Sequence, residues 1–184
     1  MNHFKFRLAQ QTDIPKLVAL INAAYRRQEG RSWTSEAEIV AGQRVSTSQL
    51  AQSLSQANFQ LWLAMHDEEY KKEEQIVACI GLTINEHDVE IGTFCIAPQV
   101  QNQGIGKQVL DFAERYIRQL DSNEHQHLNA FVMWVLSVRT ELIAYYERRG
   151  YVRTGVIEDY PLDADVGIPM MDLHLVEMRK GIHR

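Results

Sequence analysis

The 184-residue chain has little cysteine and no long apolar run, and both shortages limit what it can be. Its two cysteines, Cys79 and Cys95, each lie inside an apolar stretch, which favours core residues over a disulfide or a metal pair. A reducing, cytoplasmic setting is the simplest interpretation of that usage. The longest clean apolar run, Ala130–Leu136, falls far short of the roughly 18 residues that a membrane-spanning helix needs.

Positive charge, histidine clusters and linkers are also scarce. The formal net charge is −5, which argues against nonspecific binding to nucleic acid or to an anionic membrane. The opening residues MNHFKFRLAQ lack the apolar core of a signal peptide. Only His125 and His127 lie close in sequence, in an expected turn, so we expect no metal site. Since no Pro/Gly-rich linker interrupts the chain, residues 1–184 are predicted to form a single domain.

Hydrophobic periodicity predicts an α/β fold with a mixed sheet and helices on both faces. Tyr25–Arg44 is polar and only weakly periodic, and is expected to be a loop. Helices are expected from a cap at Thr12 or Asp13 through Ala24, at Ser46–Gln56, from Ile105 through Leu120 and at Thr140–Arg149. Strands are expected at Phe4–Leu8, Phe59–Met65, Ile76–Ile84, Asp88–Ile96, Leu128–Val138, Tyr151–Ile157 and Met171–Met178.

Two glycines precede the strongly periodic helix, in the pattern Gln101-x-x-Gly104-x-Gly106. A dinucleotide fingerprint would need glycine or alanine where Val109 stands, and a phosphate-binding P-loop would need Ser or Thr where Gln108 stands. A diphosphate-binding site that needs no metal remains possible by this elimination, because the backbone N–H groups from Gln103 to Lys107 lie at the positive end of the expected helix. A tight strand-to-helix turn without any ligand is the alternative.

The flanks of these glycines resemble the acetyl-CoA-binding signature of the GNAT superfamily of N-acetyltransferases. The stretch EIGTFCIAPQVQNQGIGKQVLDFAERYI ends a strand at Ile96-Ala97-Pro98, continues through the glycine turn, and carries Ala113-Glu114 on the helix. A second family motif follows the next expected strand as YERRGY, with Tyr146, Gly150 and Tyr151. The order of expected elements is similar to the family's over almost the whole chain.

The resemblance implies a mostly antiparallel twisted sheet and acetyl-CoA as co-substrate, with no metal. In the family the backbone N–H at the position of Ile96 faces the thioester oxygen, and Phe94 and Ile96 pair with the pantetheine amides as a strand would. The residues implied to bind the cofactor are Phe94, Cys95, Ile96, Gln101, Asn102, Gln103, Gly104, Ile105, Gly106, Lys107 and Arg139.

Arg139 marks a departure from the family pattern. Many members carry asparagine seven residues before the motif tyrosine, where it contacts CoA, and this chain has Arg139 there. Two interpretations stay open: Arg139 reaches a CoA phosphate, or it is a solvated residue at the start of a helix.

The family transfers the acetyl group by direct attack of an amine within a ternary complex. An alkylammonium has a pKa of about 10 and must lose a proton first. Glu90 is the candidate base, through a water if needed, and Tyr146 is the candidate acid for the departing thiolate. Their alternatives are an ordinary polar strand residue and a core tyrosine. Cys95 has no adjacent base and is expected to fill the core rather than to act as a nucleophile, and Tyr145 is expected to pack.

The acceptor is expected to be a primary amine of a small molecule or peptide, not nucleic acid or membrane. Two loops would frame it, and their charges disagree: Tyr25–Arg44 is basic, which suits a carboxylate, whereas Glu158–Pro169 is acidic, which suits a cationic amine. Both can also be plain solvated loops. A non-catalytic protein that binds or senses acyl-CoA is the alternative function, and a homodimer is possible because relatives often form one.

Overall fold

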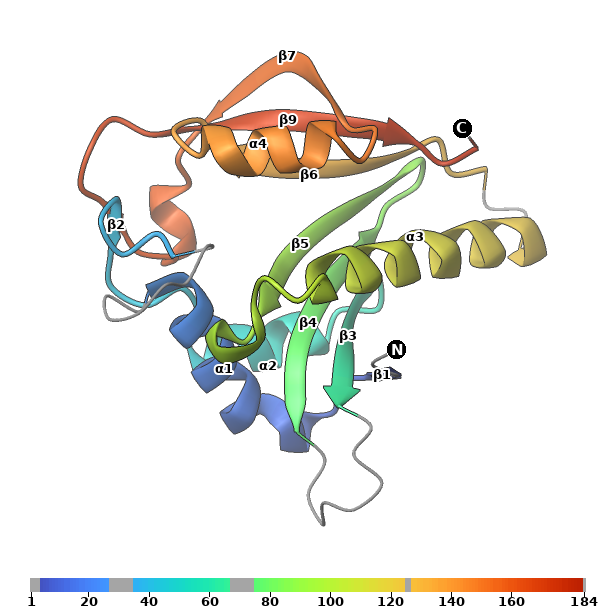
Figure 1. The fold of residues 1–184 in the computed structure, drawn as a ribbon, viewed down its shortest axis with the longest axis horizontal. Helices are drawn as coiled ribbons and strands as arrows, with labels where there is room; N and C mark the ends of the chain where they lie inside the picture. The colour runs from blue at the N-terminus through green and yellow to red at the C-terminus, as the bar shows by residue number, and fades with distance from the viewer. Residues whose placement is uncertain (1–3, 27–34, 67–74, 125–126, 184) are drawn as a thin grey trace.

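The computed structural model describes residues 4–26, 35–66, 75–124 and 127–183. Seven strands form the main sheet in the order β1-β3-β4-β5-β6-β9-β7 (Figure 1). Their bounds are β1 Phe4–Leu8, β3 Phe59–His66, β4 Ile76–Ile84, β5 Asp88–Ile96, β6 Ala130–Leu136, β7 Val152–Asp159 and β9 His174–Gly181. Every neighbouring pair is antiparallel except β5 and β6. The predicted mixed, mostly antiparallel sheet is therefore confirmed.

In the part of the chain that the structure describes, four α-helices cover the two faces of this sheet. Their bounds are α1 Ile14–Arg26, α2 Thr47–Leu54, α3 Ile105–Glu124 and α4 Thr140–Glu147. The apolar faces of α3 and α4 share one buried cluster, which includes Val109, Ile117 and Ile143. Those of α1 and α2 share a second cluster, with Leu17 and Leu50. Helices thus lie on both faces, as the periodicity predicted (Figure 1).

The parallel pair β5 and β6 meets along only part of its length. Their register begins at Asp88 opposite Ala130 and ends at Glu90 opposite Val132. Beyond Glu90 the two strands diverge, which Figure 1 shows as a widening angle between them. Because β4 pairs with the other side of β5, the residues from Ile91 to Ile96 have one strand edge that pairs with no strand among the described residues.

Several expected boundaries move in the structure. Helix α1 continues to Arg26, so Tyr25 is helical and not the start of a loop. The last strand begins at His174 and ends at Gly181, later than the expected Met171–Met178. A short pair, β2 Val40–Ala41 with β8 Ile168–Pro169, was not predicted, because two-residue strands carry no readable alternation. Residues 27–34 of the expected loop, with Arg27, Arg31 and Trp33, and the turn 67–74 lie outside the described residues.

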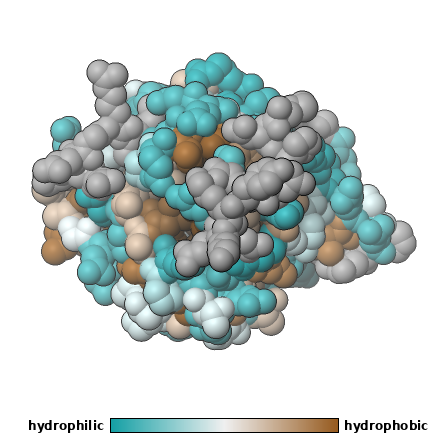
Figure 2. Space-filling model, turned by 60° about the horizontal axis from the view of Figure 1, so that its bottom comes forward, coloured by the Kyte–Doolittle hydropathy of each residue, from teal (hydrophilic) through white to brown (hydrophobic). Residues whose placement is uncertain are grey.

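The two cysteines lie in the core, as their apolar sequence neighbours predicted. Cys79 and Cys95 are free and buried, with their sulfur atoms 3.4 Å apart in the cluster under α1. Within the described ranges, no helix combines the length and the apolar character needed to span a bilayer. On the face that Figure 2 shows, hydrophilic side chains predominate and apolar ones are seen mainly in the recesses between them.

Candidate active site

A β-bulge shapes β5 where it separates from β6. Gly81 of β4 lies opposite Gly92, and Cys79 lies opposite Cys95. Between these two pairs, β5 advances by three residues and β4 by two, so β5 contains one extra residue. Thr93, inside the bulge, has a φ of 45°, in the left-handed region that non-glycine residues seldom occupy. The extra residue changes which way the following backbone groups point.

Beyond the bulge, the backbone of Ile96 and Phe94 faces the edge that β6 has left. The N–H of Ala97 donates to the carbonyl of Val77 on β4 at 2.8 Å. Because successive residues of a strand alternate, the polar groups of Ile96, and of Phe94 two residues earlier, point to the opposite edge. Side chains bind two of the carbonyls there: Tyr25 at Phe94, 2.8 Å, and Gln101 at Ile96, 3.0 Å.

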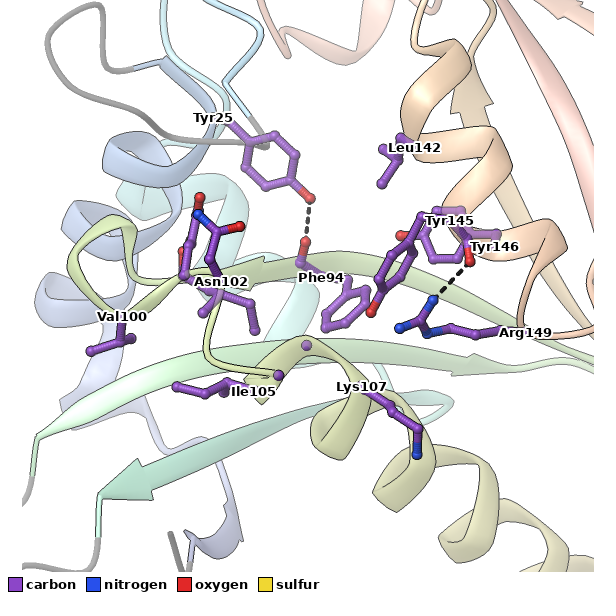
Figure 3. A pocket seen from close by; sticks show the side chains of 14 residues that line it. Tyr25, Phe94, Val100, Asn102, Ile105, Lys107, Leu142, Tyr145, Tyr146 and Arg149 are labelled. Atoms are coloured by element: carbon purple, nitrogen blue, oxygen red, sulfur yellow. Dashed lines mark hydrogen bonds between the residues drawn. The ribbon is translucent and has the colours of Figure 1, made fainter. Parts of the chain in front are cut away.

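A first pocket of about 220 Å³ lies beside this edge and the start of α3. Tyr25 points into it from one side, and Leu142, Tyr145 and Tyr146 of α4 point into it from the other (Figure 3). Eight of the eleven predicted cofactor residues line it: Phe94, Ile96, Gln101, Asn102, Gly104, Ile105, Gly106 and Lys107.

The glycine turn leaves room for a ligand at the helix start. Gly104 has a φ of 77° and Asn102 a φ of 63°, so the turn uses left-handed backbone at two positions. A Cβ added at Gly104 would meet nothing within 4 Å, whereas one at Gly106 would lie 3.2 Å from the hydroxyl of Tyr145. Gly104 is therefore needed for the backbone conformation, and Gly106 for the close approach of Tyr145.

Arg149 and Tyr145 form a stacked pair on the wall of the first pocket. The guanidinium carbon of Arg149 lies 3.4 Å from the centre of the Tyr145 ring, and its Nη1 donates to the Tyr145 carbonyl at 2.9 Å. The Nε of Arg149 is buried without a hydrogen-bond partner. Together with Lys107, Arg149 brings positive charge to the pocket that contains the glycine turn (Figure 3).

A second pocket, of about 390 Å³, adjoins the first. Four residues line both pockets, namely Tyr25, Phe94, Leu142 and Tyr146, so the two spaces meet at these side chains. The second pocket also contains Glu90, Glu158 and Asp159 on its strands, and Arg26, Glu36 and Arg44 from the N-terminal part of the chain.

Tyr146 and Glu90 occupy different parts of this arrangement. Tyr146 is 7% exposed at the junction, and burial holds the pKa of its phenol well above the usual value, so it keeps its proton. Glu90 is half-buried in the second pocket, where burial first and then the negative charge of Glu158 raise its carboxyl pKa. The junction therefore combines a protonated phenol with access to a carboxyl group that holds its proton more tightly than usual.

Three predicted cofactor residues do not line the first pocket. The Cys95 side chain is buried on the opposite face, beside Cys79. Gln103 is exposed outside it. Arg139 is buried, and its guanidinium bonds to Glu141 at 2.5 Å and to the Ser35 carbonyl at 3.4 Å. The interpretation of Arg139 as a solvated residue is therefore wrong, because its side chain is buried. The interpretation that it reaches a CoA phosphate gains no support, because its side chain does not line the first pocket.

Sequence reasoning missed Tyr25, Leu142 and Arg149, and treated Tyr145 only as a packing residue. Leu142, Tyr145 and Arg149 follow one another at three- and four-residue steps along α4 and just past its end at Glu147, so one helix face could have indicated them. Tyr25 carried no signal, since 69 residues separate it from Phe94. Among the residues that the structure describes, no group of three or more His, Cys, Asp or Glu could hold a metal ion.

Comparison with known families gives a match over just over half of the chain. A family model described as "Acetyltransferase (GNAT) domain" matches residues 57–153, which run from the start of β3 to the start of β7. This range contains the β5 bulge, the glycine turn and α4. A comparison with curated protein sequences finds no match.

Solved structures resemble the fold over nearly its whole length. The ribosomal-protein-S18-alanine N-acetyltransferase of Escherichia coli superposes with a TM-score of 0.69 at 14% identity, covering 98% of this chain and 94% of that one. The spermidine N-acetyltransferase of Vibrio cholerae in complex with CoA and spermine gives 0.68 at 16% identity, covering 98% and 96%. A GNAT family acetyltransferase from Elizabethkingia anophelis with acetyl-CoA bound gives 0.59 at 15%, covering 98% and 99%.

Proposed function

The chain belongs to the acetyltransferase (GNAT) domain family, and on that premise we propose that it moves an acetyl group from acetyl-CoA to a primary amine. The amine attacks the thioester directly while both substrates are bound. The observation that carries this proposal is the pair of pockets that meet at Tyr146: the first has the glycine turn, and the second has Glu90.

The first pocket fits the donor. Acetyl-CoA supplies an activated acetyl group on a thioester and a diphosphate that needs cationic partners. The turn at Gly104 leaves open space beside the N–H groups at the start of α3, which suits the diphosphate. The buried, unpartnered Nε of Arg149 and the Lys107 ammonium add positive charge. The pantetheine amides would bind along the edge of β5 from Phe94 to Ile96.

The chain's own groups would stabilise the negative charge that develops on the thioester oxygen. The N–H of Ile96 faces the edge that β6 leaves, where it would donate to that oxygen. The bulge at Thr93 fixes this direction through backbone geometry, so no side chain needs to move during the reaction. Donors that are already oriented lower the barrier more than donors that must reorganise.

Glu90 would accept the proton of the ammonium, directly or through a water. Its raised pKa brings it closer to the range in which a base both ionises and retains basicity. Tyr146 would donate a proton to the departing CoA thiolate from the junction of the pockets, and the second proton that the attacking nitrogen loses on becoming an amide would restore the phenol. Because burial keeps its phenol protonated, the donation depends on the position of Tyr146 rather than on acid strength.

A thiol-release assay tests the proposal. The purified protein is mixed with acetyl-CoA and a panel of primary amines, and free CoA thiol is measured over time. We expect release that depends on the amine, together with an acetylated product detected by mass spectrometry. Acetyl-CoA binding in calorimetry without thiol release on any amine would instead favour the alternative, a protein that binds or senses acyl-CoA. Absence of acetyl-CoA binding would exclude both.

A further inference from the structure

The second pocket carries more negative than positive charge. Its described ionisable lining comprises four carboxylates, Glu36, Glu90, Glu158 and Asp159, and two guanidinium groups, Arg26 and Arg44. With every group ionised, four negative and two positive charges give a net charge of −2. Glu90 is half-buried, whereas Glu158 and Asp159 are exposed, so salt screens part of this excess and it acts on a ligand most strongly at low ionic strength.

Arg26 is already neutralised. Its Nη1 lies 2.6 Å from Oε2 of Glu36, both side chains are about nine-tenths buried, and its Nη2 donates to the Val166 carbonyl at 2.7 Å. These bonds hold α1 against the segment that precedes β8. The Arg26–Glu36 pair therefore serves the structure of the pocket. A substrate carboxylate would have to displace Glu36 to reach Nη1, and the Nε of Arg26, which has no hydrogen-bond partner, is buried.

Arg44 is the one cation that remains to oppose three carboxylates on the described wall. Its guanidinium carbon lies 5.5 Å from the centre of the Tyr25 ring, which already stabilises its charge. No ion pair joins it to Glu90, Glu158 or Asp159 in the described part of the chain. We call those three carboxylates the acidic wall.

The acidic wall combines two strands that are far apart in sequence. Glu90 comes from β5, whereas Glu158 and Asp159 come from the end of β7. Glu158 is close enough to Glu90 for its negative charge to raise the pKa of the Glu90 carboxyl, after the larger effect of burial. Three carboxylates that share a cavity with a single cation, Arg44, repel each other, and a bound second cation reduces that repulsion.

We propose that the acceptor is an aliphatic amine with at least two ammonium groups. This inference rests on the proposed function and specifies its substrate class. The reacting amine lies between Glu90 and the junction at Tyr146, and the second ammonium is bound by Glu158 and Asp159. An amino acid is disfavoured, because its carboxylate would face the acidic wall, where Arg44 is the one cation outside an ion pair among the described lining residues.

Acceptors that have the same chain length and differ in their terminal group separate the effect of the second charge from the effect of size. For each length from four to eight carbons, the α,ω-diamine, the monoamine and the ω-amino acid are compared as acceptors in the thiol-release assay. We expect kcat/KM to be about tenfold higher for the best diamine than for the monoamine of the same length, and lowest for the amino acid. Equal values for diamine and monoamine, or a preference for the amino acid, would overturn the inference.

Substitutions in the acidic wall test whether it causes the preference for the diamine over the monoamine. Glu158→Gln and Asp159→Asn should each reduce the diamine-to-monoamine ratio several-fold, and added salt should reduce the wild-type ratio as well. Asp163→Asn is the control, because Asp163 lies in the neighbouring short helix and does not line the second pocket. A ratio unchanged in both wall variants would remove the role assigned to Glu158 and Asp159.

Calorimetry separates failure of this inference from failure of the proposed function. Diamines and monoamines are titrated into the protein saturated with CoA, so the charge preference is measured even where no turnover occurs. Tighter binding of the diamine without thiol release would contradict the catalytic proposal and support the charge assignment. Turnover of both amines, with equal affinity for monoamine and diamine, would support the catalytic proposal and contradict the charge assignment.

Discussion

The hydroxyl of Tyr25 donates a hydrogen bond of 2.8 Å to the carbonyl oxygen of Phe94 (Figure 3). This bond connects α1, on one face of the sheet, to the edge of β5 that β6 leaves. Burial holds the pKa of Tyr25 well above the usual value, so the phenol remains a donor. Both residues line the two pockets, and the bond therefore fixes the backbone where donor and acceptor would meet.

Tyr25→Phe should lower both stability and catalytic efficiency. The substitution keeps the ring and removes the donor, so we expect a loss of about 1 kcal/mol in the free energy of unfolding. The KM for acetyl-CoA should rise several-fold, because Phe94 would no longer be held. Urea denaturation and steady-state kinetics measure the two effects. Tyr116→Phe, in the aromatic cluster of α3 with Trp62 and Phe112, is the control for a lost phenol. Equal KM values in the two variants would contradict the positioning role.

Tyr146→Phe should slow turnover while leaving acetyl-CoA binding nearly unchanged. A general acid contributes about 100-fold or more to rate, so kcat should fall by about that factor. Calorimetry with acetyl-CoA gives the affinity, and thiol release gives kcat. Tyr151→Phe is a matched control, because its ring contacts Tyr146 but its hydroxyl donates to Glu114 outside the pockets. A kcat that does not change in Tyr146→Phe would exclude the acid role.

Glu90 gives a prediction about pH. A base must be ionised, so kcat/KM for a monoamine should fall as the pH drops through the raised pKa of Glu90. Glu158→Gln removes the second cause of that raised pKa, so the acidic limb of the profile should move to lower pH. The pH–rate profiles of the two proteins measure the shift. Identical profiles would mean that another group controls this limb.

Glu90→Gln should separate activity from stability. A carboxyl whose folded-state pKa is raised stabilises the fold at low pH, and that contribution is lost as the pH rises through the folded-state value. The neutral amide avoids this loss, so the variant should gain stability relative to the wild type as the pH rises from 4 to 7. Its turnover should fall about 100-fold. Thermal denaturation of both proteins across pH checks the first effect, and a variant that loses stability relative to the wild type toward neutral pH would contradict it.

Much of the fold was readable from the sequence, because strand and helix periods are local signals. The glycine turn and the YERRGY motif were equally local, and eight predicted residues do line one pocket. The rest depended on long-range contacts. Arg139 could not be predicted to be buried, since its partners include the backbone of Ser35, 104 residues away. The acidic wall joins Glu90 to Glu158 only after β7 pairs with β9.

The last prediction concerns Glu114, which anchors α3 to the C-terminal strand. Its side chain is 6% exposed and accepts hydrogen bonds from Lys180 at 2.6 and 2.8 Å, from Tyr151 at 3.0 Å and from Arg118 at 3.2 Å. Glu114→Gln leaves the Lys180 ammonium and the Arg118 guanidinium without their anion, so we expect a loss of about 3 kcal/mol in the free energy of unfolding. Urea denaturation measures it. The control is Glu147→Gln, which breaks an exposed pair with Arg153 and should cost less than about 0.5 kcal/mol. Similar losses in the two variants would show that burial of Glu114 adds nothing to its contribution.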